Sequence, residues 1–229
     1  MKIDPHKPLP SHTKLRYEEC YAKEFLEFLY PNKYKDLAIR DKPDLYDSIN
    51  DVGIEVVEAE NERKKEAVKL WYTMLYVSEN KKQQNKERMK QLGEEYSEPI
   101  QIWKSDDYSK GLDSEPFVVL FDSIKSKLEK LNDGNYKVCK RYELFVESLM
   151  EFRKNLWEEV LEKLVSMSSE YRLRYDIIYV LTRETICSYD ILFQKVIFND
   201  ITKDQVRIAM KAREMVIAGE TERTSDENN

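Results

Sequence analysis

The chain has 229 residues, of which 41% are hydrophobic and 36% are charged, and its formal net charge is −6. This length suits one elaborated domain, and fifteen tyrosines, eight phenylalanines and three tryptophans are enough for a hydrophobic core. Five glycines and seven prolines argue against a loop-rich all-β fold. The sequence has no run of about 18 apolar residues, so we expect no membrane partner.

The cysteines and histidines exclude several kinds of site. Cys20, Cys139 and Cys187 are far apart and form no CxxC pair, and the N-terminus lacks the apolar stretch of a secretory signal. We therefore expect free thiols and a cytoplasmic protein. Both histidines, His6 and His12, lie in the proline-containing N-terminal stretch, which argues against a zinc site or a histidine-based triad.

In the N-terminal half, the pattern predicts a helix, two strands and a second helix. Residues 1–13 read as an extended leader, and an amphipathic helix is expected over 14–30, ending before Pro31. Two strands, at 43–47 and 52–60, are expected to pair as a hairpin. A long helix over 60–92 follows, and its second half is almost wholly polar, so we expect that half to project into solvent.

The second half of the chain alternates between helices and strands. The predicted elements are a short strand at 100–103, a helix over 115–131, a strand at 141–148, a helix over 154–168, strands at 175–181 and 185–191, and a helix over 202–218. Residues 219–229 read as a disordered acidic tail. The order predicts an α/β (α+β) domain over 14–218, with a mixed central sheet flanked by helices and a helical insertion at 61–114.

Glutamates interrupt the apolar pattern of the second predicted strand, "GIEVVEAEN" (53–61). Because side chains alternate along a strand, Glu55 shares a face with Val57 and is flanked by apolar neighbours. An unpaired buried carboxylate costs several kcal/mol, so Glu55 needs a cation, a donor or a metal. Asp44 lies on the preceding strand, and a pair of neighbouring strand carboxylates is the usual protein contribution to a Mg²⁺ site. Such a site can activate water for attack on a phosphate.

The stretch "KPDLYDSINDVGIEVVEAE" (42–60) resembles the signature of the PD-(D/E)XK nuclease superfamily. The matching residues are Pro43, Asp44 and Glu55, and the order helix, strands, helix, strand over 14–148 also matches. The resemblance implies the restriction-endonuclease-like fold, with Asp44 and Glu55 as metal ligands and Mg²⁺, or Mn²⁺, as the cofactor.

The resemblance has further implications for the site and its substrate. A glutamate of the first helix often faces the family's site, and here that residue would be Glu18. The family also implies DNA as the substrate, with RNA left open, in a bacterial defence or repair setting. The stretch 61–93 carries nine Lys and Arg against four Glu, and its basic part would hold phosphates.

The sequence departs from the family at the position of its lysine, two residues after the strand acid, which is Val57 here. Members of the superfamily can supply this lysine from the following helix, where Lys127 falls about 20° from Leu120 on the helical wheel. Alternatively, the run Glu58-Ala59-Glu60 supplies the site, with Glu60 in place of the lysine but on the other strand face. The third alternative is an inactive enzyme.

Each candidate residue also has a structural interpretation. Asp44 can cap a turn, and Glu55 can be an edge-strand charge that discourages aggregation. Glu18 can pair with a base on its own helix, and Lys127 can extend along apolar surface to solvent. Two hypotheses follow: a Mg²⁺-dependent endonuclease in which Lys127 and Glu18 assist catalysis, and an inactive nuclease-fold module that binds nucleic acid or protein.

Overall fold

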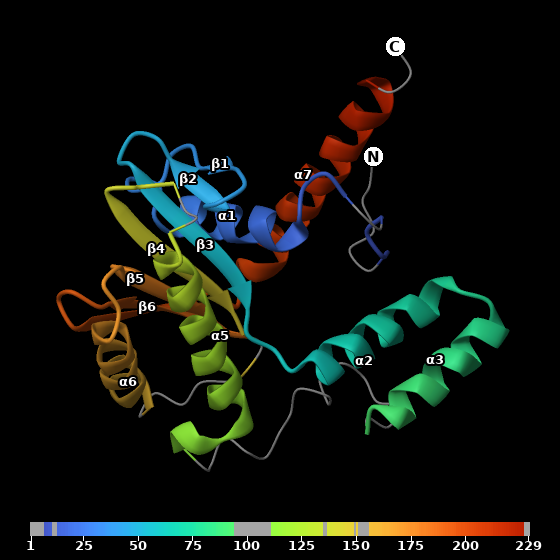
Figure 1. The fold of residues 1–229 in the computed structure, drawn as a ribbon. Helices are drawn as coiled ribbons and strands as arrows, with labels where there is room; N and C mark the ends of the chain where they lie inside the picture. The colour runs from blue at the N-terminus through green and yellow to red at the C-terminus, as the bar shows by residue number, and fades with distance from the viewer. Residues whose placement is uncertain are drawn as a thin grey trace.

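The fold is known from a computed structural model, which describes residues 7–10, 13–93, 111–134, 137–148, 150 and 156–226 (Figure 1). The helices are α1 (Tyr17–Leu29), α2 (Glu62–Thr73), a 3₁₀ turn η1 (Met74–Tyr76), α3 (Glu79–Gln91), α5 (Glu115–Asn132), α6 (Trp157–Ser169) and α7 (Gln205–Asp226). The strands are β1 (Ala38–Ile39), β2 (Leu45–Asp47), β3 (Val52–Glu58), β4 (Arg141–Glu147), β5 (Ile177–Leu181), β6 (Thr185–Asp190) and β7 (Lys195–Asp200). Within the described ranges no helix is both long and apolar enough to cross a membrane.

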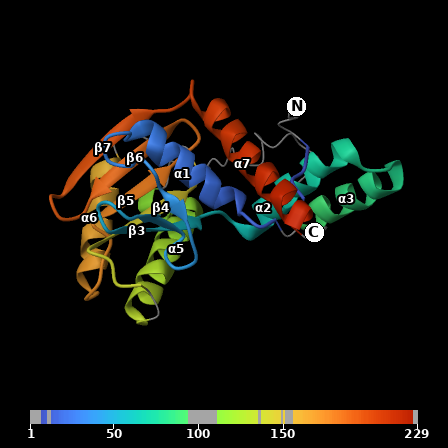
Figure 2. The same ribbon diagram turned by 90° about the horizontal axis from the view of Figure 1, so that it is seen from above.

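All seven strands form one mixed sheet in chain order, from β1 to β7. The central strands β3, β4 and β5 are parallel, and every other neighbouring pair is antiparallel. Helices α1 and α7 pack on one face of the sheet, and α5 and α6 pack on the other (Figures 1 and 2). The predicted α/β class with a mixed central sheet is therefore confirmed.

The central strands are buried because helices cover both of their faces. The first five residues of β3 are buried, and so are the five middle residues of β4. Alternation sends Ile54 and Val56 toward α1 and α7, while Val57 lies on the opposite face, against α5. Glu55 shares the face of Val57, so the fold directs this carboxylate toward α5.

The predicted long helix over 60–92 is wrong, because two antiparallel helices stand in its place. α2 ends in η1, and Ser78, in an extended conformation, begins α3. α3 folds back so that its Met89 is buried against Ala67 and Met74 of the first limb. The arm formed by α2 and α3 lies beside the sheet domain (Figures 1 and 2). The second half of the polar stretch therefore packs on the first half through a few apolar residues.

Other elements differ from expectation in extent. The edge strands β1 and β7 were not predicted: β1 has two residues, and β7 is largely exposed. Helix α7 continues to Asp226, through part of the predicted disordered tail. The predicted strand at 100–103 lies outside the described residues.

A buried ionic network ties the segment after α1 to the sheet. Glu143 of β4 is fully buried, and Lys33 Nζ donates to its carboxylate at 2.8 Å. Tyr34 also donates its hydroxyl to Glu143, and Lys33 Nζ contacts Tyr179 OH of β5 at 2.9 Å. A carboxylate without solvent needs such partners, so this network is a structural anchor.

We expect Lys33→Met to destabilise the protein by about 2–4 kcal/mol, because it leaves the charge of Glu143 buried without its cation. Urea unfolding followed by circular dichroism measures the change. Lys35→Met, at an exposed position two residues away, is the control and should unfold like the wild type. Adding Glu143→Gln to Lys33→Met should recover part of the loss, and a double variant no more stable than the single one would contradict this account.

Candidate active site

The two predicted metal ligands come from β3 and from the turn just before β2. The register pairs Leu45 of β2 with Ile54 of β3, which puts Asp44, just before β2, beside Glu55. The Oδ2 atom of Asp44 accepts a hydrogen bond of 2.7 Å from the backbone N–H of Val56. The carboxylate of Asp44 is therefore bonded to β3. The interpretation of Asp44 as a local turn cap is wrong.

Lys127 of α5 contacts both carboxylates. Its Nζ lies 2.7 Å from Glu55 Oε2 and 3.5 Å from Asp44 Oδ2. The side chains of Glu55 and Lys127 are 4% and 14% exposed, so this ion pair lies largely out of water. The interpretation of Glu55 as an edge-strand charge is therefore wrong, because Glu55 stands on an interior strand between β2 and β4. The interpretation of Lys127 as a side chain that extends into solvent is also wrong.

The alternative acids, Glu58 and Glu60, do not join this group. Glu58 follows Ile54 and Val56 on the strand face that is covered by α1 and α7. Its carboxylate pairs with Lys65 of α2 at 2.8 Å. The run from Glu58 to Glu60 therefore does not replace Glu55 beside Asp44.

The glutamate of α1 that interacts electrostatically with Asp44 is Glu19, not the predicted Glu18. Glu19 is buried and interacts electrostatically with Asp44 and Lys127. Glu18 is more exposed and lines cavities together with Tyr17. The buried face of α1 consists of Glu19, Cys20, Tyr21, Ala22, Phe25 and Leu26, which excludes Glu18.

Glu19 is poised to exchange a proton near neutral pH. Burial raises its pKa to about 7, the charge of Asp44 adds to the increase, and Arg16 opposes it. Arg16 lies 3.4 Å from Glu19, and its side chain is mostly exposed. A carboxyl group whose pKa lies near 7 is suited to general acid–base chemistry.

An open hollow of about 370 Å³ borders Lys127. Its lining includes Val57 of β3 and, from α5, Ser126, Lys127 and Lys130. Lys127 therefore contacts the carboxylate pair and also borders open surface. A ligand that enters the hollow can meet its ammonium group without opening the core.

The donor set fits a hard divalent cation. Asp44 and Glu55 offer carboxylate oxygens, which Mg²⁺ and Mn²⁺ prefer. In the part of the chain that the structure describes, no group of three or more His, Cys, Asp and Glu side chains could hold a metal. A cation held here would therefore take two protein carboxylates and fill its other positions with water or phosphate oxygens, as Mg²⁺ commonly does.

Gly53 makes room for the turn that carries Asp44. A Cβ atom at Gly53 would lie 2.9 Å from Pro43 Cγ and 3.1 Å from Cys139 Sγ. We expect Gly53→Ala to destabilise the protein by about 1–3 kcal/mol by displacing Pro43, with urea unfolding as the measurement. The control is Gly219→Ala, where the new atom meets only the Leu15 side chain, at 3.3 Å. Equal unfolding midpoints for Gly53→Ala and the wild type would contradict this expectation, because they would show that Pro43 can move aside without a loss of stability.

We expect Glu19→Gln to change the pH dependence of stability. Folding raises the pKa of Glu19 from 4.5 to about 7, so the folded state favours the protonated form. The wild type therefore loses stability relative to the variant as pH rises from about 4.5 to 7, and the difference is constant above that range. At pH 8 the variant should have gained about 3 kcal/mol of stability relative to the wild type, compared with pH 4.

Thermal or urea unfolding between pH 4 and pH 8 measures this difference. Glu129→Gln removes an exposed carboxylate from α5 and is the control for the change in net charge. A constant stability difference between Glu19→Gln and the wild type across this pH range would mean that Glu19 does not titrate as its surroundings require.

No protein-family model, curated protein or solved structure matches this chain. The functional assignment therefore depends on the residues themselves. Its main support is the convergence of Asp44, Glu55 and Lys127 from a turn, a strand and a helix.

Proposed function

We propose that this protein is a metal-dependent nuclease of the PD-(D/E)XK type that hydrolyses DNA phosphodiester bonds. The observation that carries the proposal is the position of Lys127 Nζ, 2.7 Å from Glu55 and 3.5 Å from Asp44. Val57 stands where the superfamily has a lysine, and a lysine from the helix before β4 thus takes that place beside the two carboxylates. The order α1, β2, β3, α5, β4 also agrees with the core of that superfamily.

Each side chain has a role in this proposal. Asp44 and Glu55 would hold Mg²⁺ or Mn²⁺, which when bound polarises the phosphate and lowers the pKa of coordinated water. Lys127 would donate a hydrogen bond to the attacking water or to a phosphate oxygen. Glu19, with a pKa of about 7, would accept or return a proton at this site.

The ion pair of Lys127 imposes a condition on metal binding. Its ammonium group neutralises the same two carboxylates that would serve as ligands, so a cation and Lys127 compete for them. The side chain borders the hollow lined by Ser126 and Lys130, which offers space for the ammonium group to turn away. Binding of a phosphate in this hollow would favour that movement, since it gives the ammonium group a new anion.

A second candidate function is a binding module without catalysis, and the ion pair of Lys127 with Asp44 and Glu55 favours it. If Lys127 stays on these two carboxylates, it is their permanent counter-ion and no metal is needed. The net charge of −6 also fits a protein that does not bind nucleic acid strongly over its whole surface. Metal binding separates the two functions.

We expect the wild type to cut labelled single- or double-stranded DNA in Mg²⁺ or Mn²⁺. Asp44→Asn, Glu55→Gln and Lys127→Met should each lower the rate by about 100-fold or more, since each removes a ligand or a donor at the reacting phosphate. Lys125→Met, at an exposed position on the same helix, is the matched control and should cut at the wild-type rate. Gel analysis of the products measures the cleavage.

Cleavage that survives both Asp44→Asn and Glu55→Gln would place the activity elsewhere and overturn the proposal. Absence of cleavage together with absence of Mg²⁺ or Mn²⁺ binding by calorimetry would favour the binding module. Lys127→Met is informative here too, because removal of the competing ammonium group should tighten metal binding while it slows cleavage.

A further inference from the structure

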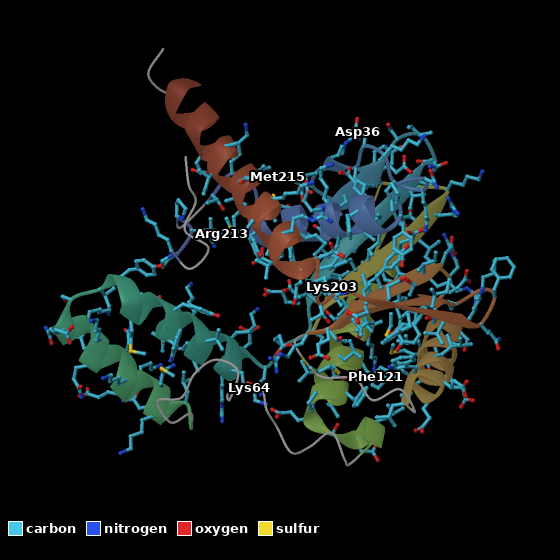
Figure 3. The ribbon with its side chains drawn as sticks, turned by 180° about the vertical axis from the view of Figure 1, so that it is seen from behind. Asp36, Lys64, Phe121, Lys203, Arg213 and Met215 are labelled. Atoms are coloured by element: carbon cyan, nitrogen blue, oxygen red, sulfur yellow. The ribbon has the colours of Figure 1, made fainter. Side chains whose placement is uncertain are left out.

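A cationic cavity lies between the arm and the rest of the protein. It encloses about 840 Å³ and is lined by the leader segment 7–10 and by residues of α1, α2 and α7. Figure 3 labels Arg213 on α7 and Lys64 at the base of the arm, on the two sides of this region. The cavity brings together parts of the chain that the candidate active site does not use.

The charged lining is strongly biased toward cations. Four basic side chains, Lys7, Arg16, Lys69 and Arg213, line the cavity against one acid, Glu18. Arg16 also forms ion pairs with Glu18, at 3.7 Å, and with Glu19, at 3.4 Å. Lys69 is exposed and makes no ion pair within the described part of the chain. The cavity therefore attracts anions.

Two tyrosines give the same cavity an aromatic lining. Tyr17 comes from the first residue of α1, and Tyr72 lies near the end of α2, three residues after Lys69. At this spacing Lys69 and Tyr72 share one face of the helix. A cation and an aromatic ring side by side offer a phosphate contact and a stacking surface for a neighbouring base.

We propose that this cavity binds single-stranded DNA and presents it to the proposed nuclease site. The inference rests on the proposed function, and it names the substrate form. Tyrosine rings can stack on bases only where those bases are not already stacked in a duplex. A concave cavity of this size accommodates individual nucleotides, whereas a duplex is a wide rod that contacts proteins mainly through its outer phosphates and grooves.

The cavity is connected to the candidate active site. Arg16, on its wall, contacts Glu19, which interacts electrostatically with Asp44. An adjoining cavity of about 1000 Å³ shares Leu9, Tyr17, Glu18 and Lys69 with the first and reaches Glu58. Glu58 stands three residues after Glu55 on β3 but on the opposite face of the sheet, so the link from the cavity to the carboxylate pair is the contact of Arg16 with Glu19. A strand held by Lys69 and Tyr72 would therefore approach the carboxylate pair past Arg16.

Fluorescence anisotropy with labelled oligonucleotides in EDTA measures binding without cleavage. We expect the wild type to bind a single strand more tightly than a duplex of the same length. Tyr72→Ala should weaken single-strand binding by about 5- to 100-fold, and Tyr72→Phe should restore it, because stacking needs only the ring. Lys69→Ala should weaken binding and lower the salt dependence by about one phosphate contact.

Lys81→Ala, an exposed change on α3 outside both cavities, is the matched control and should bind like the wild type. Equal affinities for Lys69→Ala, Tyr72→Ala and Lys81→Ala, or a preference for the duplex, would overturn the inference even if cleavage is observed. Binding that depends on Tyr72 and Lys69 in a protein that does not cut DNA would support the inference while the proposed nuclease activity fails.

Discussion

A carboxylate buried on an interior strand is the constraint around which this sheet and its helices are arranged. Glu55 stands among apolar side chains between β2 and β4, where an uncompensated charge would cost several kcal/mol. Lys127 meets it from α5, and Asp44 is held beside it by the amide of Val56. The surroundings of this one charge depend on three features: the position of α5 on the sheet, the turn before β2, and the space at Gly53.

A second buried acid shows what a purely structural carboxylate looks like in the same fold. Glu143 of β4 pairs with Ile54 in register and points to the opposite face from Glu55. Lys33, Tyr34 and Tyr179 surround it, and no solvent reaches it. Glu55 has one lysine, a neighbouring acid and an open hollow beside that lysine. The difference in access favours Glu55 as the functional group and Glu143 as the anchor.

The candidate site was predicted from two kinds of signal. Alternation in β3 predicts that Glu55 is buried, whereas the resemblance to the nuclease superfamily pointed to Asp44 and to a lysine on the following helix, where the edge of the apolar stripe selected Lys127. Glu19 was missed because a shift of one residue rotates a helix by about 100°, and three other glutamates in α1 obscure its phase. The break at Ser78 and the edge strand β7 depend on tertiary packing, which a sequence window does not contain.

Charge counting along the chain also overstates how basic the arm is, because the fold pairs many of its cations. Lys65 binds Glu58, and Arg88 binds Glu66 through two hydrogen bonds. Paired charges contribute little to the field at a distance, so only part of the arm's cations are left to attract a phosphate. Lys69 is one of them, and it lies beside Tyr72 in the cavity rather than on the outer surface of the arm. Because the net charge is −6, the protein as a whole repels an anionic strand, and such a strand can bind only where unpaired cations gather. The distribution of unpaired cations therefore determines where on the surface the strand binds.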